Sequence, residues 1–174
     1  MGKTQSSIKH YCRQEAETAS LAQSLATHLT EYFNHDPKAH LNIALEGDLG
    51  AGKTTFARFL IQGMGHEGKV KSPTYTLCET YPLKMNGQKI TAYHFDLYRM
   101  KDPLEWQEAG FDEYFDVPGF CLIEWPEKAE GTLPPFDMVI QLTSGSEENE
   151  RNILIEAKTV NGMHILQAIN SNPQ

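Results

Sequence analysis

The sequence has little arginine, little cysteine and no long apolar run. Of its 15 basic residues only four are arginine, namely Arg13, Arg58, Arg99 and Arg151. Acidic residues number 23, so the formal net charge is −8. A protein that holds nucleic acid through its overall field needs a basic surface. The charge therefore argues against bulk nucleic-acid binding, although it permits a small local phosphate site.

The cysteines and the start of the chain point to a reducing compartment. Cys12, Cys78 and Cys121 are odd in number and far apart, and no CxxC pair occurs. This spacing argues against a disulfide framework and against a zinc knuckle. The sequence contains no run of about 18 apolar residues, so it predicts no membrane span. Its polar start lacks the apolar core of a signal peptide. We therefore expect a cytoplasmic protein with no membrane segment.

The chain is long enough for one domain with its own core. Its 174 residues are 40% hydrophobic, and a domain of this size can fold without disulfides. We expect a single domain over residues 1–174. Its ordered core should cover about residues 13–158, because residues 1–12 look loose and the last ten or so carry little pattern.

Apolar spacing predicts alternating helices and strands. Residues 13–33 and 53–63 have helical periodicity, and 102–110 begin like a capped helix with Asp102 before Pro103. Short apolar runs at 41–45, 119–125, 138–142 and 152–155 are typical of strands. Residues 75–83 and 89–95 flank Asn86 and Gly87, a dipeptide that favours a hairpin turn.

The strongest motif lies between the 41–45 strand and the 53–63 helix. Its eight residues fit GxxxxGK[ST] in full: Gly47, Asp48, Leu49, Gly50, Ala51, Gly52, Lys53 and Thr54. Glycines let backbone N–H groups surround phosphates, and the helix N-terminus adds partial positive charge. Lys53 should reach the β- and γ-phosphates, and the Thr54 hydroxyl should ligate Mg²⁺. We therefore expect a nucleotide-binding loop.

Two acidic residues directly follow apolar strands, at positions from which they could hold a metal ion or an attacking water. Asp96 ends the 89–95 strand and Glu124 ends the run from Phe120, so both should lie at the edge of the sheet where ligands bind. The residues leave their division of roles open. His94 and Asp96 share a strand face, but with no third ligand nearby a transition-metal pair is disfavoured. Trp125 is either a core aromatic or a site residue, and Thr74 is either in a plain connection or in a phosphate-sensing switch.

Several nucleotide-binding classes can be weighed against these residues. A GTPase would carry NKxD, which does not occur. A small-molecule or nucleoside P-loop kinase is a serious alternative, but such enzymes clamp phosphates with several arginines and no arginine-rich lid is evident. A binding module without turnover is a third possibility. We favour an ATPase that is weak alone, because the low arginine count suggests that a partner completes its site.

Four segments together resemble one known family. They are GDLGAGKTT, then SPTY from Ser72 to Tyr75, then HFDLYR from His94 to Arg99, then IEWPEK from Ile123 to Lys128. In this order the chain resembles the bacterial TsaE family, also called YjeE, over roughly residues 13–158. The resemblance implies an α/β fold: a single P-loop NTPase domain whose mostly parallel central sheet is extended by antiparallel hairpin strands.

The resemblance also implies a function. Family members are ATPases needed for the threonylcarbamoyl modification of adenosine 37 in tRNA, and they act with the TsaB–TsaD pair, so that contact with tRNA is indirect. Matched by position, Gly47 to Thr55 form the nucleotide loop, and Thr74 lies in the switch segment. Asp96 is implicated in hydrolysis and Glu124 in Mg²⁺ binding, with Trp125 beside it. The expected cofactors are ATP and Mg²⁺.

Overall fold

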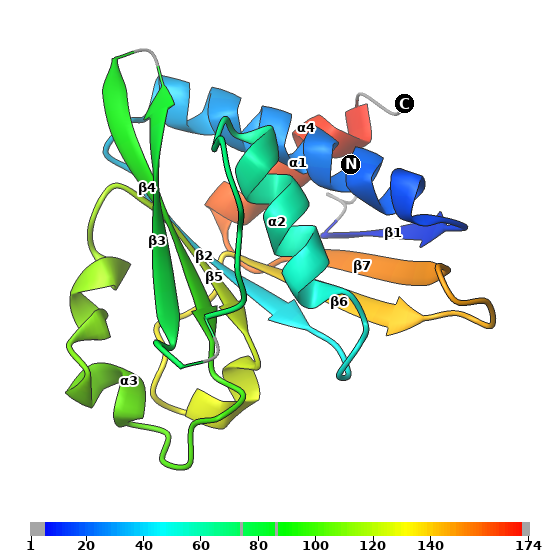
Figure 1. Cartoon of the computed structure of the whole chain (residues 1–174). Coiled ribbons are helices and arrows are strands. Elements are labelled where there is room, and N and C mark those ends of the chain that lie inside the picture. Colours follow the sequence, from blue (N-terminus) through cyan, green and yellow to red (C-terminus); the bar gives the residue numbers. More distant parts are fainter. Residues whose placement is uncertain (1–5, 74, 86, 172–174) are drawn as a thin grey trace.

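The computed structural model describes residues 6–73, 75–85 and 87–171, and it is built around one seven-stranded sheet (Figure 1). The strands are β1 (Ser7–Cys12), β2 (His40–Glu46), β3 (Cys78–Met85), β4 (Gln88–Asp96), β5 (Gly119–Glu124), β6 (Met138–Ser144) and β7 (Arg151–Ala157). Their spatial order is β1-β7-β6-β2-β5-β4-β3. Strands β6, β2, β5 and β4 run parallel to one another. Strands β7, β1 and β3 add antiparallel pairs at the two sides, which confirms the expected mixed α/β sheet.

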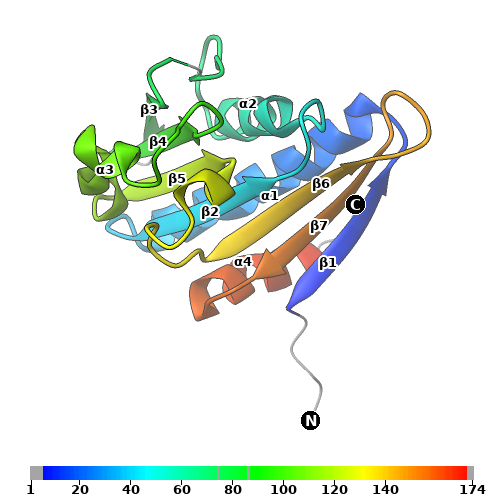
Figure 2. The same ribbon diagram turned by 90° about the horizontal axis from the view of Figure 1, so that it is seen from below.

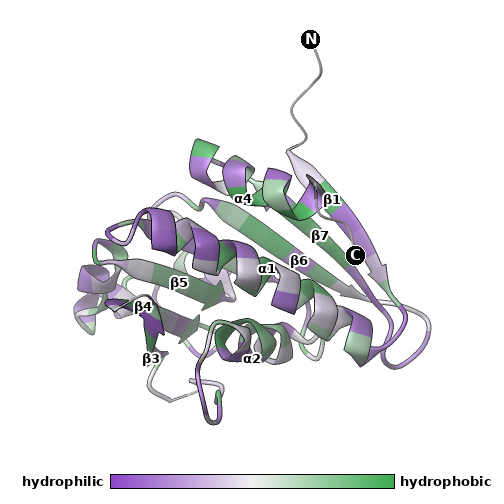
Figure 3. Ribbon diagram, turned by 90° about the horizontal axis from the view of Figure 1, so that it is seen from above, coloured by the Kyte–Doolittle hydropathy of each residue, from purple (hydrophilic) through white to green (hydrophobic). Residues whose placement is uncertain are grey.

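The long helices cover one face of the sheet. The helical elements are α1 (Glu15–His35), α2 (Lys53–Gly63), α3 (Glu105–Glu108), α4 (Val160–Ser171) and two 3₁₀ turns, η1 (Phe111–Phe115) and η2 (Pro126–Ala129). Figure 3 shows α1, α2 and α4 lying across the same face. Figure 2 shows α3 under the β4 and β5 side of the opposite face, whereas β6, β7 and β1 lie open there. No helix in the described ranges is long and apolar enough to cross a bilayer.

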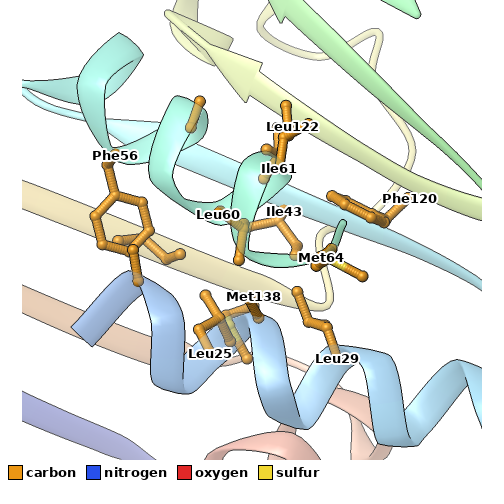
Figure 4. Close-up of a cluster of buried hydrophobic side chains, with 14 of the residues drawn as sticks. Leu25, Leu29, Ile43, Phe56, Leu60, Ile61, Met64, Phe120, Leu122 and Met138 are labelled. Carbon is orange, nitrogen blue, oxygen red and sulfur yellow. The ribbon is translucent and has the colours of Figure 1, made fainter. Parts of the chain in front are cut away.

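The main core lies between these helices and the sheet. Leu25 and Leu29 of α1 face Phe56 and Leu60 of α2 (Figure 4), and all four side chains are fully buried. Ile43, Phe120, Leu122 and Met138 close the same cluster from the strands. Burial of each such side chain contributes about 1.5–3 kcal/mol. The core therefore fixes the start of α2, and with it the glycine loop, against the ends of β2 and β5.

A second apolar cluster lies on the opposite face under β4 and β5. Trp106, Phe95 and Phe115 form its centre, with the Trp106 and Phe115 rings 5.0 Å apart. Trp106 Nε1 donates to Thr132 Oγ1 at 2.8 Å, so the indole keeps a hydrogen bond although it is buried. This cluster supports β4 and β5 from below, where their last residues carry the two predicted acids.

Most predicted elements are confirmed, with small changes of boundary. The helix predicted over 102–110 is shorter: it begins at Glu105 with Leu104 at its N-cap, so Asp102 is not the N-cap expected. Asp102 still accepts from the Leu104 N–H, and Glu105 accepts from the Asp102 N–H, both at 2.9 Å. The hairpin between β3 and β4 is present; its turn residue Asn86 lies outside the described residues.

The expectation of loose ends is wrong for the described parts of both ends. Residues Ser7–Cys12 form strand β1, paired along its length with β7. Residues Val160–Ser171 form helix α4, whose Ile165, Leu166 and Ile169 are buried in the main core. These two elements are stabilised by partners distant in the sequence, so local pattern alone did not indicate them.

Candidate functional site

The glycine motif forms the turn from β2 to α2. Gly47, Gly50 and Gly52 have φ values of 153°, 83° and 101°, a range that side chains rarely adopt. A Cβ on Gly47 would lie 2.6 Å from the carbonyl oxygen of Leu142 on β6. Asp48 and Leu49 are exposed at the tip, and the Ala51 N–H donates to the Asp48 carbonyl at 3.0 Å. The motif therefore has the glycine-dependent backbone typical of a phosphate loop.

Lys53, the first residue of α2, lies inward under Trp125. Its ammonium group donates to the Gly47 carbonyl oxygen and lies 3.4 Å from the centre of the Trp125 ring. The residue is only 5% exposed. Burial lowers the pKa of the Lys53 ammonium, while the negative charges of Glu124 and Glu127 oppose that shift. Trp125 itself has left-handed backbone (φ 59°, ψ 50°) directly after β5, which turns its ring over the loop.

Thr54 and Glu124 meet although 70 residues separate them. The Thr54 hydroxyl lies 3.0 Å from both carboxylate oxygens of Glu124, at the end of β5. The imidazole Nε2 of His94 lies 2.6 Å from Glu124 Oε2. Glu124 is thus a buried carboxylate held by a hydroxyl on one side and an imidazole on the other. Thr54 and Glu124, each of which was expected to hold Mg²⁺, thus lie in contact, and their roles stay predictions.

Asp96 ends β4 directly beside Glu124 in the parallel register of β4 and β5. Its Oδ2 accepts from the Ser72 hydroxyl at 2.9 Å, and its Oδ1 accepts from the Tyr98 N–H at 3.0 Å. Both carboxylate oxygens are therefore oriented by donors. Ser72 belongs to the segment that also contains Thr74, which lies outside the described residues.

These groups line one cavity of about 480 Å³ at the carboxyl end of the parallel strands. Nine of the predicted site residues line it: Leu49, Gly50, Gly52, Lys53, Thr54, Thr55, Asp96, Glu124 and Trp125. Ala51 instead lines a smaller neighbouring cavity, together with Thr55 and Gly52. Gly47 and Asp48 support the loop from outside the two linings. The sequence motifs thus meet in space where a parallel sheet binds its ligands.

The cavity is lined by more arginine than the low arginine count of the sequence suggested. Arg99 and Arg151, two of the four arginines, line the cavity. Arg151 Nε donates to the Ala51 carbonyl at 2.7 Å, and Arg151 Nη1 donates to the Glu148 and Glu150 carbonyls at 2.8 and 2.7 Å. The Arg99 guanidinium lies 4.9 Å from the ring centre of Tyr75. Both guanidinium groups therefore engage protein groups.

Sequence reasoning missed Arg151 and the role of His94. Arg151 lies 100 residues from the loop it contacts, at the start of β7, with no motif around it. His94 was weighed as a metal ligand, whereas its Nε2 contacts the Glu124 carboxylate. Its place two residues before Asp96 on one strand face was the only available signal.

The fold and this loop define a P-loop protein of the α/β class. A family model described as "Threonylcarbamoyl adenosine biosynthesis protein TsaE" matches residues 12–153. A protein of Haemophilus influenzae named tRNA threonylcarbamoyladenosine biosynthesis protein TsaE is 46% identical over 79% of this chain and 82% of its own length. The protein of that name from Bacillus subtilis is 42% identical over 62% of this chain and 65% of its own length.

A solved structure agrees with these sequence matches. The crystal structure of YdiB from Bacillus subtilis superposes with a TM-score of 0.73 at 29% identity, over 95% of both chains. The chain described here therefore belongs to the TsaE family.

Proposed function

We propose that this chain binds ATP with Mg²⁺ in the cavity, hydrolyses it, and serves the threonylcarbamoyl modification of adenosine in tRNA. The observation that carries the proposal is the meeting of Lys53, Thr54, Asp96 and Glu124 around one cavity at the loop. The relatives named as tRNA threonylcarbamoyladenosine biosynthesis proteins support the pathway. The loop and its acids support nucleotide hydrolysis as the chemistry.

The residues present suit Mg²⁺ and a polyphosphate. Mg²⁺ prefers oxygen ligands, and the Thr54 hydroxyl and Glu124 carboxylate, 3.0 Å apart, are both oxygen donors. The chemistry that Mg²⁺ supplies when bound is neutralisation of phosphate charge. Lys53 would exchange its contact with the Gly47 carbonyl for a phosphate oxygen, as its flexible stem allows. The backbone of Gly50 and Gly52 would receive the other phosphate oxygens.

Asp96 is the residue we assign to the attacking water. It lies next to Glu124 in register, so both acids face the same end of the cavity. The Ser72 hydroxyl and the Tyr98 N–H fix its carboxylate, which then accepts a hydrogen bond from water in a defined direction. Glu124 is already engaged by Thr54 and His94, and this favours the metal role for Glu124 over the water role.

We propose that the TsaB–TsaD complex is the partner and that the lone chain turns ATP over slowly. Transition-state charge on a phosphoryl group is often met by an arginine with free donors. Here the Arg151 guanidinium is already bound to backbone carbonyls and the Arg99 guanidinium lies over the Tyr75 ring, although both side chains line the cavity. A partner that supplies or frees such a group would raise the rate. Contact with tRNA would then come through the partner.

The test is ATP turnover with and without TsaB–TsaD. We expect the complex to raise turnover, and we expect Asp96→Asn to lower it about 100-fold or more while ADP still binds. Lys53→Ala should remove ADP binding itself. Asp112→Asn, an exposed acid outside the cavity lining, is the matched control and should be unchanged.

Two results would contradict the proposal. Turnover that survives both Asp96→Asn and Glu124→Gln would show that the acids are misassigned. Phosphoryl transfer to a small acceptor faster than to water would indicate a kinase instead.

A further inference from the structure

His94 is a buried polar residue with no direct part in the proposed chemistry. It lies on β4, fully buried, two residues before Asp96 and on the same face of the strand. In the register of β4 and β5, His94 is paired with Leu122 and Asp96 with Glu124. The imidazole therefore lies below the carboxylate of Glu124, on the core side of the site.

The contact between the side chains of His94 and Glu124 is short and buried. His94 Nε2 lies 2.6 Å from Glu124 Oε2, and the side chains are 0% and 3% exposed. To an ionised Glu124, which only accepts hydrogen bonds, the imidazole donates in its Nε2–H tautomer. Hydrogen bonds to a charged partner are stronger than neutral ones, and burial strengthens them further. His94 therefore restrains one oxygen of Glu124 while the Thr54 hydroxyl contacts the carboxylate from the loop.

The other ring nitrogen argues against a packing role. His94 Nδ1 is buried and has no hydrogen-bond partner among the described residues. An apolar side chain of similar size would fill this volume without a buried, unpaired nitrogen. Within the described ranges, the only polar contact of the imidazole is Glu124. A role for His94 therefore acts through the position of that carboxylate.

We propose that His94 is a positioning residue that holds Glu124 in the orientation that receives Mg²⁺. The inference rests on the proposed Mg²⁺–nucleotide site. Partners that orient a metal-binding side chain commonly matter 10–100-fold for metal affinity. His94 would not touch nucleotide, metal or water. Its effect should therefore appear in the Mg²⁺ dependence of nucleotide binding, separately from the affinity measured without metal.

The experiment measures ADP affinity by calorimetry in excess EDTA and again in saturating MgCl₂, for the whole chain. His94→Met keeps the size and removes the donor, whereas the amide of His94→Gln can reach the place of Nε2. His40→Met is the matched control, because His40 is hydrogen-bonded to Val117 and Asn42 at the far end of β2. Thermal unfolding of each variant checks that it is folded.

We expect His94→Met to reduce the Mg²⁺-dependent gain in ADP affinity about tenfold or more, with affinity in EDTA unchanged. His94→Gln should retain the gain to within about threefold, and His40→Met should retain it fully even if the variant is less stable. An equal loss with and without Mg²⁺, or a loss in His94→Gln as large as in His94→Met, would overturn the positioning role. If His94→Met does not fold, His94→Leu, which also lacks a hydrogen-bond donor, takes its place. Wild-type protein that binds no ADP, or binds it without regard to Mg²⁺, would overturn the proposed function as well.

Discussion

At the scale of single residues, Lys53 combines a charge that phosphate needs with a site that disfavours that charge. The side chain is almost fully buried under Trp125, and burial lowers the pKa of its ammonium group. Only the protonated amine attracts phosphate. As the pH rises through the lowered pKa, the fraction of charged Lys53 in the free protein falls. We therefore expect ADP affinity to weaken at a lower pH than an ordinary lysine would give.

The measurement is the ADP dissociation constant between about pH 8 and pH 11, where phosphate is already fully ionised. The affinity should fall by about tenfold per pH unit once the pKa of free Lys53 is passed. Lys53→Arg is the control, because guanidinium stays charged throughout this range, so any binding it retains should vary little. An affinity that is constant for the wild type up to the ordinary lysine pKa would contradict the expectation.

The residue scale also shows where sequence reasoning reaches its limit. Lys53, Thr54 and the glycines were predictable because a phosphate loop is a local motif whose spacing carries its chemistry. Asp96 and Glu124 were predictable because each follows an apolar strand. The contact of His94 with Glu124 was not predictable, since it depends on the register of β4 against β5, and many registers suit the same two sequences.

At the scale of elements, one arginine connects the β6–β7 hairpin to the glycine loop between β2 and α2. Arg151 begins β7 and donates to the Ala51 carbonyl, while its Nη1 holds the hairpin carbonyls of Glu148 and Glu150. Removing it leaves these carbonyls without a charged donor. Hydrogen bonds of this kind contribute about 1.5–3 kcal/mol. We expect Arg151→Met to lower the free energy of unfolding by about that amount and to weaken ADP binding.

Urea unfolding and calorimetry with ADP check this prediction. Arg58→Met is the matched control, because Arg58 has a 4.0 Å contact with Glu15 and lies 5.3 Å from the ring centre of Phe59. Such exposed pairs contribute at most about 1 kcal/mol, so the control should change stability little. Equal effects of the two substitutions would show that Arg151 does not brace the loop.

The helices and strands differ in how well the sequence predicted them. Helix α1 was evident because its apolar residues repeat over 21 residues. Strand β1 was missed because only Ile8 and Cys12 of its six residues are buried, and its identity comes from pairing with β7. Helix α4 was missed because its buried residues, Ile165, Leu166 and Ile169, gain their partners from α1 and β7. Contacts with residues distant in the sequence therefore determine the structure at both ends of the chain.

At the scale of the whole molecule, these ends complete the sheet and its helical cover on the side of β7. Strand β1 lies next to β7, and α4 packs on α1 and β7, so the two ends of the chain support the same side of the fold (Figure 3). That side carries Arg151 and the β6–β7 hairpin. The ends thus belong to the framework that positions the loop, although they lie far from it in the sequence.

The net charge of the whole molecule disfavours direct binding of tRNA. A charge of −8 repels a polyanion, and the cavity would meet phosphate with loop backbone and Lys53 without needing a basic surface. We expect the lone chain to bind tRNA more weakly than about 10⁻⁴ M at physiological salt. Fluorescence anisotropy of labelled tRNA measures this for the chain alone, for TsaB–TsaD alone and for both with ATP. TsaB–TsaD should account for the tRNA affinity of the mixture. Tight, salt-sensitive binding by the lone chain would mean that it contacts tRNA directly.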